Sequence, residues 1–523
     1  MSYPKKPNIL HIFTDQQRAD TVNALGNPVM HTPNLDRLCR EGTAFTNAYA
    51  ASPVCVASRC SMIHSLYPHQ TGYYANCCSQ PELKVEQKDS FMHGLTRAGY
   101  RTHGIGKCHF YPDLYALRGF QSREYEEGHC SLDQPDDYTR YLKQNFDYQH
   151  IDNPYGTGSE MYYIPQLATV PAAKHPTRWI GDRSVRFIRE QQNDQPWYLF
   201  TSFIHPHPPF TPPSPWHRLY HGYDMPLPRL PADYETLLTY VNRAQNRYKG
   251  RDAGQDKNLV RLIKAYYYAC ISFIDQQVGR MLKALEQNNQ LDNTLIVFTS
   301  DHGEMLGDLN SWGKRSMHDA SARIPLLARL PGVFPADQQC ATAVSLMDLA
   351  PTFLNLGRSK LNTHTAEGKD LLQTLNSPDK NRFVFSHYAY TAPVNLTNSR
   401  NIIKYPRTER KKEIAATSTY MAVNEDWKYF YSAPDNREFL FDRKLDPDEN
   451  RNRYGIVNYN DQVSRLKHIL QRHLLDGGLN EGIVNNDWKK FPKLETDTNP
   501  DAGFIEQGVR TPWFDPEIPG YTD

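Results

Sequence analysis

Four short apolar stretches of the sequence end in side chains that can bind a metal ion or carry a proton. Each stretch is bounded by breakers, which is typical of a buried parallel strand. The side chains that follow the stretches are Asp15 and Gln16, Lys107 and His109, His205 and His207, and Asp301 and His302. Because ligands bind outside the carboxyl ends of parallel strands, four separate segments can deliver these groups to one crevice. Singly, each residue has an ordinary alternative, such as a helix cap or a surface histidine.

A divalent cation is the first chemistry that this set of side chains supports. Asp15, Asp301, the side-chain oxygen of Gln16 and a ring nitrogen of His302 form an oxygen-rich ligand set. Such a set favours calcium, magnesium or manganese, and the imidazole favours manganese slightly. Lysines and histidines around the metal would neutralise a sulfate or phosphate group, and a histidine would protonate a leaving oxygen. What these segments lack is a nucleophile.

Cys55, in the stretch SPVCVASRCSM, is the candidate for that missing part. It stands at the start of a predicted helix that ends at Pro68. The dipole and the free N–H groups of a helix start would stabilise a thiolate there. Arg59 adds a cation one turn further along the same side. Taken alone, Cys55 has another interpretation, a buried cysteine that packs as a small hydrophobic residue, which is the commoner fate of a lone cysteine.

At this point the sequence resembles the type I sulfatases, the formylglycine-dependent members of the alkaline-phosphatase-like superfamily. Their signature is Cys or Ser, any residue, Pro or Ala, any residue, Arg, and it appears here as CVASR, followed by LYPHQTG. The resemblance continues in the expected order through PNILHIFTDQQRAD, HTPNLDRLCREGTAFTNAY, GKCH, HPHPPF, TSDHGEMLGD, WGK, ARIPL and EFLFDRKLDPDENRNRYG. This ordered series spans most of the chain, so it is far more specific than the short signature alone.

The resemblance implies that Cys55 is oxidised after translation to formylglycine, whose hydrated aldehyde attacks sulfur. The metal would be held by Asp15, Gln16, Asp301, His302 and an oxygen of the converted Cys55. We expect calcium, with manganese or magnesium as alternatives. Asp301 would also take the proton of the attacking hydroxyl. The implied catalytic residues are Cys55, Arg59, Lys107, His109, His207 and Lys314.

The same resemblance implies a role for each of these catalytic side chains. Lys314 and His207 would contact the sulfate and the bridging oxygen, with His207 as the acid for the leaving group. Lys107 and Arg59 would stabilise the hydroxyl and aldehyde groups. His109 would deprotonate the second hydroxyl, which expels sulfate and restores the aldehyde.

Three further residues, Arg18, His205 and His318, are candidates for substrate binding. Arg18 has an equally good alternative, an ion pair with an acid elsewhere in the fold. His205 lies two residues before His207, on the same side of an extended segment. His318 comes four residues after Lys314, which would place it beside the leaving group.

Two departures from the family pattern leave alternatives open. Ala57 stands where many members have Pro, so the maturing partner is either the aerobic formylglycine-generating enzyme or the more tolerant anaerobic sulfatase-maturating enzyme. SDHGE replaces the Asp-Asn of many arylsulfatases, and Asp-His occurs in choline sulfatases and phosphonate monoester hydrolases.

The resemblance therefore predicts a sulfatase, a sulfuric ester hydrolase that removes sulfate from a small substrate, with a sulfated sugar or oligosaccharide as the expected class. The alternative is a phosphonate monoester or phosphodiester hydrolase, or a choline-type sulfatase, with the same machinery. A non-catalytic anion-binding protein in which Cys55 stays a thiol is a third hypothesis. The sequence disfavours it, because every position needed for turnover is filled.

The elements that must position these groups follow an alternating pattern. Helical patterns in PNLDRLCREG, RSVRFIREQQ and LVRLIKAYYYACISFIDQQVGRMLKALEQ lie between the apolar stretches. The alternation predicts an α/β fold, a large doubly wound, mostly parallel sheet flanked by helices. Aromatic-rich alternating stretches predict a smaller C-terminal antiparallel sheet. We expect a catalytic domain over residues 1–380, the small sheet with a helix over 381–485, and a tail over 486–523 that packs on the body or on a neighbouring subunit of a homo-oligomer.

Composition argues against several classes of function. The 523 residues include 59 Lys and Arg and 58 Asp and Glu, a formal net charge of +1 that gives no footprint for nucleic acid or a membrane surface. No apolar run approaches a membrane span, and the one near the N-terminus is too short for a signal peptide. The odd number of cysteines, nine, fits poorly with a disulfide framework. We therefore expect a cytoplasmic protein without nucleic-acid or membrane partners.

Overall fold

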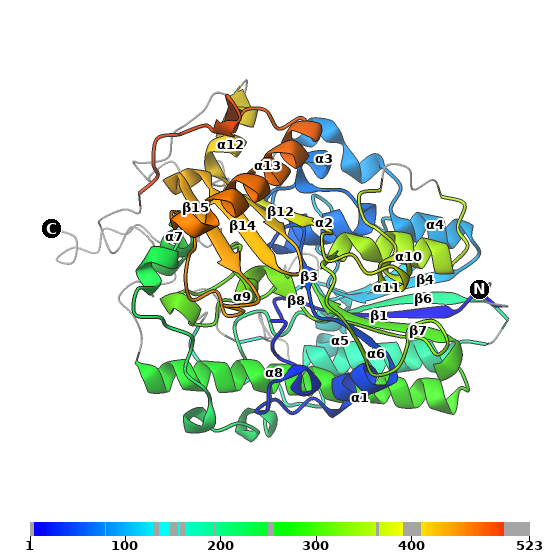
Figure 1. The fold of residues 1–523 in the computed structure, drawn as a ribbon. Helices are drawn as coiled ribbons and strands as arrows, with labels where there is room; N and C mark the ends of the chain where they lie inside the picture. Colours follow the sequence, from blue (N-terminus) through cyan, green and yellow to red (C-terminus); the bar gives the residue numbers. More distant parts are fainter. Residues whose placement is uncertain are drawn as a thin grey trace.

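An eight-stranded, mostly parallel sheet forms the centre of the fold (Figure 1). The structure is a computed structural model that describes residues 5–78, 80–128, 135–146, 155–156, 163–192, 194–248, 256–361, 366–390 and 409–495. The strands are, in order, β10 (Gln338–Cys340), β2 (Thr43–Phe45), β9 (Leu326–Arg329), β7 (Thr294–Ser300), β1 (Asn8–Thr14), β6 (Trp197–Ser202), β4 (Arg101–Gly106) and β5 (Ser122–Tyr125). β9 is antiparallel to both of its neighbours, and the other pairs are parallel. The predicted α/β fold is confirmed.

Helices cover both faces of this sheet (Figure 1). Along β1, Ile9 and Phe13 point to one face, where they join a hydrophobic cluster with residues of α2 (Cys55–His64), α4 (Phe91–Arg97) and α10 (Leu349–Leu356). Leu10 and Ile12 point to the other face and join residues of α1 (Pro33–Glu41), α6 (Pro176–Glu190) and α8 (Lys257–Gln287). Because both faces are covered, β1, β6 and β7 are buried along their whole length, which explains their continuous apolar runs.

A four-stranded antiparallel sheet follows in the C-terminal part of the chain, as predicted. Its strands are β12 (Val384–Ala389), β13 (Ser418–Val423), β14 (Trp427–Ser432) and β15 (Arg437–Asp442). α13 (Asn460–Asp476) packs on one face through Leu466, Leu470 and Leu474. The other face packs on the main domain, where Phe430 joins a cluster that includes Ala57. The predicted division at residues 380 and 485 stays a prediction.

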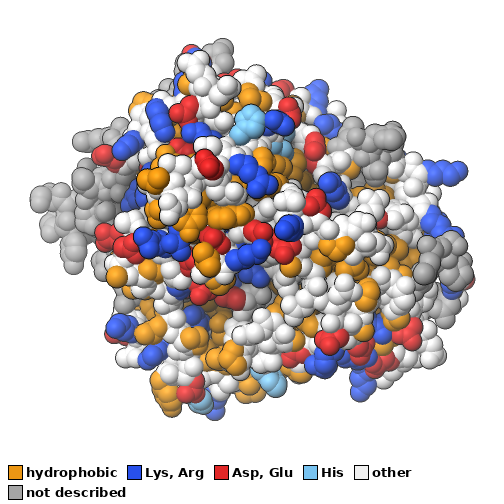
Figure 2. All heavy atoms as spheres, in the orientation of Figure 1, with side chains coloured by type: hydrophobic (Ala, Val, Ile, Leu, Met, Phe, Trp, Pro, Cys, Tyr) orange, Lys and Arg blue, Asp and Glu red, His pale blue; other side chains and the backbone are white. Residues whose placement is uncertain are grey.

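The remaining elements are short. They are the helices α3 (Pro68–Thr71), α5 (Asp137–Asn145), α7 (Tyr240–Tyr248), α9 (Asp319–Ala322), α11 (Leu371–Asn376) and α12 (Arg410–Thr417) and the strands β3 (Ala48–Tyr49), β8 (Arg323–Ile324), β11 (Val344–Ser345), β16 (Ile483–Val484) and β17 (Asp487–Trp488). No helix within the described ranges is long and apolar enough to cross a bilayer. Figure 2 shows basic and acidic side chains interspersed over the visible face, with no large region of one charge on that face.

The start of the predicted tail packs on the C-terminal sheet. Trp488 is buried, stacks on Tyr431 with 4.4 Å between ring centroids, and donates its indole N–H to the Tyr429 hydroxyl at 2.7 Å. Phe491 is buried in the same cluster. The rest of the predicted tail, residues 496–523, lies outside the described residues.

A histidine of α13 that packs between β12 and the segment around α3 should make stability sensitive to acid. The His473 ring stacks on Phe385 with 3.8 Å between centroids, and burial, with a smaller contribution from His69, lowers its pKa from 6.5 to about 3. Since this folded pKa lies below the unfolded value, stability is lost as the pH falls below about 6.5. Phenylalanine keeps the stacking but does not titrate. When the pH is lowered from 7 to 4.5, we therefore expect the unfolding free energy of His473→Phe to fall by about 2 kcal/mol less than that of the wild type. Denaturant titrations at both pH values measure this difference, and parallel losses would contradict it.

Candidate active site

The register of two central strands brings the predicted metal ligands together. β1 and β7 are parallel neighbours with Thr14 paired to Ser300, so Asp15 and Asp301 leave the sheet side by side. One ligand atom each of Asp15, Cys55, Asp301 and His302 lies within 4.8 Å of the others, and all of these side chains are buried. Asp15, Asp301 and His302 thus follow two adjacent strands and lie together, and Cys55 joins them from the start of α2; that they bind a metal stays a prediction.

His302 and Gln16 are oriented as metal ligands would be. His302 Nδ1 donates to the carbonyl oxygen of Gly303 at 3.0 Å, which leaves Nε2 as the basic nitrogen facing the cluster. Gln16 Nε2 donates to a carboxylate oxygen of Glu304. The other end of the amide, Oε1, is buried and has no hydrogen-bond partner among the described residues. A buried acceptor without a donor, next to two carboxylates, fits a divalent cation.

Cys55 is the first residue of α2 and lies at the centre of this cluster. Its Sγ is 2.8 Å from Lys314 Nζ, 3.3 Å from His302 Nε2 and 3.6 Å from Asp15 Oδ1. Burial alone would raise the pKa of the thiol. The nearby Lys314, His302 and Lys107 outweigh burial and hold the pKa of Cys55 well below its usual value. The surroundings of this atom therefore stabilise negative charge.

Arg59 and Lys107 fix the two carboxylates. Arg59 is buried one turn after Cys55, and its guanidinium contacts Asp301 Oδ2 at 2.9 Å and Asp15 Oδ2 at 3.3 Å. Lys107 Nζ lies 2.7 Å from the same oxygen of Asp15. Burial alone would raise the pKa of Asp15, but the cations around it lower that pKa below its usual range. Both side chains thus hold Asp15 as a carboxylate.

Two half-buried histidines, His207 and His109, face Cys55 from other strand ends. His207 Nδ1 donates to the carbonyl oxygen of Pro208 at 2.7 Å, so Nε2 is the nitrogen available for proton transfer. Burial, with Lys314, lowers the pKa of His207 to about 4, while the nearby Cys55 acts on that pKa in the opposite direction. His109 lies close enough to Cys55 to help lower the pKa of its thiol, and it has a positive φ of 52°.

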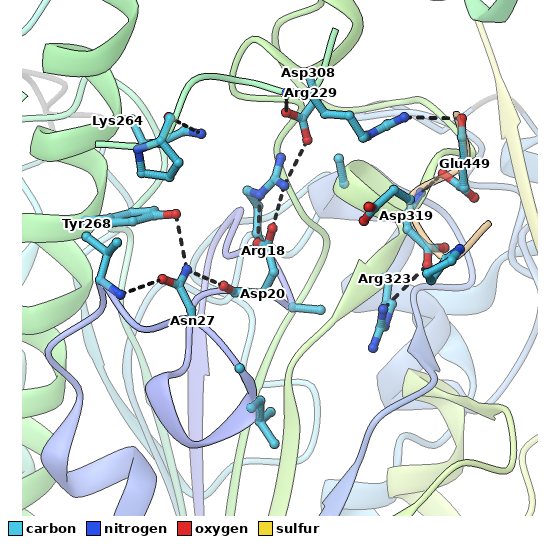
Figure 3. A pocket seen from close by; sticks show the side chains of 18 of the residues that line it. Arg18, Asp20, Asn27, Arg229, Lys264, Tyr268, Asp308, Asp319, Arg323 and Glu449 are labelled. Atoms are coloured by element: carbon cyan, nitrogen blue, oxygen red, sulfur yellow. Dashed lines mark hydrogen bonds and ion pairs between the residues drawn. The ribbon is translucent and has the colours of Figure 1, made fainter. Parts of the chain in front are cut away.

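Arg18 makes ion pairs within the fold, which is one of the two arrangements predicted for it. Figure 3 shows its guanidinium between Asp20, at 2.6 Å, and Asp308, at 2.9 Å. A further nitrogen donates to the carbonyl oxygens of Glu304 and Met305, which follow the candidate metal ligand His302 closely in the sequence. Arg18 lines a pocket of about 500 Å³ beside α8. Contact between Arg18 and the substrate stays a prediction.

His205 and His318 lie in packed surroundings. His205 is fully buried, its ring is 5.1 Å from that of His175 and 5.0 Å from that of Tyr155, and burial lowers its pKa to about 3. His318 is also fully buried, with its ring 5.3 Å from that of Phe430 in the C-terminal sheet. Spacing along the sequence suggested both residues but does not encode burial. Substrate contact by either residue stays a prediction.

Two acidic residues beside the site have a place that the sequence did not assign: Glu304 was noted only as a polar residue after its strand, and Glu127 was not noted at all. Glu127 accepts hydrogen bonds from the backbone N–H groups of Cys108, at 3.0 Å, and His109, at 2.9 Å, and so holds the segment that carries His109. Glu304 contacts Gln16, as described above. Glu304 stands in SDHGE, so its position next to the ligands was a usable signal. Glu127 belongs to no motif, and no sequence pattern indicated that it would contact the segment of Cys108 and His109.

Comparison with known proteins identifies the family. A family model described as sulfatase matches residues 7–359, more than half of the chain. The chain belongs to the sulfatase family. A second model, described as N-sulphoglucosamine sulphohydrolase, C-terminal, matches residues 307–475. The resemblance that the motifs indicated is confirmed.

Individual sulfatase-family proteins are similar over nearly the whole chain. An arylsulfatase of Clostridium perfringens is 28% identical over 507 residues, which cover 92% of this chain and 97% of the relative. An N-acetylglucosamine-6-O-sulfatase of Bacteroides thetaiotaomicron is 25% identical over 532 residues, with 89% and 86% covered. The crystal structure of a phosphonate monoester hydrolase of Agrobacterium radiobacter superposes with a TM-score of 0.74 at 24% identity, covering 91% of this chain and 96% of that one. This similarity supports the fold.

Proposed function

We propose that this sulfatase-family enzyme hydrolyses a sulfate monoester carried by a carbohydrate. The observation that carries the proposal is the position of Cys55 Sγ, 2.8 Å from Lys314 Nζ and 3.3 Å from His302 Nε2. One buried point thus combines the place of a nucleophile, a candidate metal ligand and a cation for an anionic ester. The carbohydrate part is supported by the N-acetylglucosamine-6-O-sulfatase among the relatives.

Cys55 is the proposed site of formylglycine, and Asp15, Gln16, Asp301 and His302 are the proposed ligands of a divalent cation, calcium before manganese or magnesium. The hydrated aldehyde would supply the attacking oxygen, and the cation would offset its charge. The buried carboxylates support this assignment, as does Oε1 of Gln16, which has no hydrogen-bond partner in the part of the chain that the structure describes.

The chain's own side chains then bind the ester and move protons. Lys314, whose Nζ lies beside position 55, binds an anionic oxygen of the ester. The acid would be the imidazolium form of His207, which donates a proton from Nε2 to the leaving oxygen because its Nδ1 is committed to Pro208; the anionic ester beside the ring would favour that protonated form. His109, which contacts residue 55, takes the proton whose removal releases sulfate. Arg59 and Lys107 hold the carboxylates of Asp301 and Asp15 and would also stabilise the hydroxyl and aldehyde groups of the converted residue 55.

A competition between matched esters tests the choice of sulfate over phosphonate. The phosphonate alternative is favoured by the Asp-His pair at residues 301 and 302 and by the similarity to the phosphonate monoester hydrolase. With the same aryl leaving group, we expect kcat/KM for the sulfate monoester to exceed that for the phosphonate monoester and the phosphodiester. A 6-O-sulfated N-acetylglucosamine should be a better substrate than the aryl sulfate. Faster turnover of the phosphonate would overturn the proposal.

A further inference from the structure

We propose that Glu304 is a positioning residue that turns the amide of Gln16 into a metal ligand and anchors the loop that carries Lys314. The inference rests on the proposed function, since it assigns Gln16 to the cation and Lys314 to the ester. It needs neither activity nor substrate for its test.

Glu304 is a fully buried carboxylate with an unusually complete set of donors. Oε2 accepts hydrogen bonds from Gln16 Nε2 and from the Tyr163 hydroxyl, the latter at 3.0 Å. Oε1 accepts from the backbone N–H groups of Leu306, at 3.0 Å, and Gly313. These four donors supply both oxygens of the carboxyl group with hydrogen bonds, which compensates for its burial.

The hydrogen bonds at Glu304 decide which way the Gln16 amide faces. Oε2 of Glu304 accepts a hydrogen bond, so the amide presents its donor, Nε2, to Glu304. Its acceptor, Oε1, then faces away, and it is the buried atom that lacks a partner among the described residues. Gln16 N–H meanwhile donates to Asp301 Oδ1 at 3.0 Å, which holds the backbone beside the carboxylates. The arrangement leaves an oxygen directed at a cation.

The other half of the same carboxylate reaches the residue next to Lys314. Gly313 N–H donates to Glu304, and the carbonyl oxygen of Gly313 accepts from Met305 N–H at 2.8 Å, so the loop closes on itself at its base. Lys314 follows directly, with Nζ 2.8 Å from Cys55 Sγ. The side chain of Glu304 therefore links Gln16, the proposed metal ligand, with Lys314, the residue that would bind the ester.

Replacing Glu304 by its amide tests the positioning directly. In Glu304→Gln one carboxylate oxygen becomes an NH₂ group, which cannot accept from Gln16 Nε2, so the Gln16 amide is free to turn its NH₂ group toward the metal site. We expect the affinity of the full-length, chelator-treated protein for Ca²⁺ or Mn²⁺, measured by calorimetry, to fall roughly 10- to 100-fold. Glu438→Gln is the matched control. It changes a buried glutamate of β15 that accepts from two tyrosine hydroxyls, and it should bind metal like the wild type.

A double-mutant cycle distinguishes positioning from a general loss of structure. If Glu304 acts through Gln16, Glu304→Gln should weaken metal binding little further once Gln16→Met is present. Wild-type affinity in Glu304→Gln, or fully additive losses, would overturn the proposal.

Should Glu304→Gln fail to fold, Gln16→Met alone decides the matter. It leaves the Glu304 loop intact, and unchanged affinity would mean that Glu304 has no ligand to position. A protein that binds metal as expected but hydrolyses no sulfate ester would refute the proposed function and leave this inference standing.

Discussion

Cys55→Ala lowers kcat for sulfate-ester hydrolysis by roughly 10⁴-fold or more. Removal of a covalent nucleophile has effects of this size because the remaining groups can only bind the substrate and stabilise charge. Sγ of Cys55 is the atom on which Lys314, His302 and Asp15 converge, at 2.8, 3.3 and 3.6 Å. Alanine removes the attacking group and leaves these neighbours in place.

The measurement is a steady-state rate with an aryl sulfate, made on matured wild type and variant at equal metal content. Cys60→Ala is the matched control, since Cys60 lies on the same helix α2 and is a free cysteine. We expect Cys60→Ala to retain the wild-type rate. A Cys55→Ala protein that keeps a substantial fraction of kcat would show that turnover does not use residue 55.

Lys314→Ala should have the second largest effect, a fall of roughly 10²- to 10³-fold in kcat/KM. The ammonium is almost fully buried and lies against the position from which attack occurs. In a site from which water is excluded, a preorganised cation stabilises developing negative charge far more than it would in solvent. The loss should appear with every sulfate ester, because the interaction is with the sulfate group.

Lys264→Ala is the control for loss of a buried lysine, because Lys264 is 7% exposed and Lys314 is 6% exposed. Lys264 Nζ donates to the carbonyl oxygen of Pro226 in the pocket beside α8. The kinetics of both variants are measured with two esters that differ in leaving group. Equal losses in the two lysine variants, or a Lys314→Ala loss confined to one ester, would contradict the assigned role.

The sequence predicted the centre of the site because the site follows from sheet geometry. Asp15 and Asp301 end adjacent parallel strands, so type and position along the chain were sufficient to bring them together. Cys55 was recognisable for another reason, its position at the start of a predicted helix. The alternating pattern likewise predicted the main sheet and the C-terminal antiparallel sheet.

What the sequence could not provide was burial and long-range partners. The spacing of residues along an extended segment indicates which side a side chain faces, but it does not show whether other residues cover that side. His205 and His318 are both covered and fully buried. Arg18 had two balanced interpretations until Asp308, far along the chain, was placed beside it. Glu127 stabilises the His109 segment across a contact that no motif records.

The mass of the tryptic peptide 41–59, which contains residue 55 and ends at Arg59, tests the central claim most directly. The protein is produced with either sulfatase-maturating enzyme, and sulfatase activity is measured on the same samples. The account predicts the mass of the aldehyde or its hydrate at position 55, and activity that rises with the converted fraction. A protein that hydrolyses sulfate esters at full rate while this peptide carries only the cysteine thiol would contradict it.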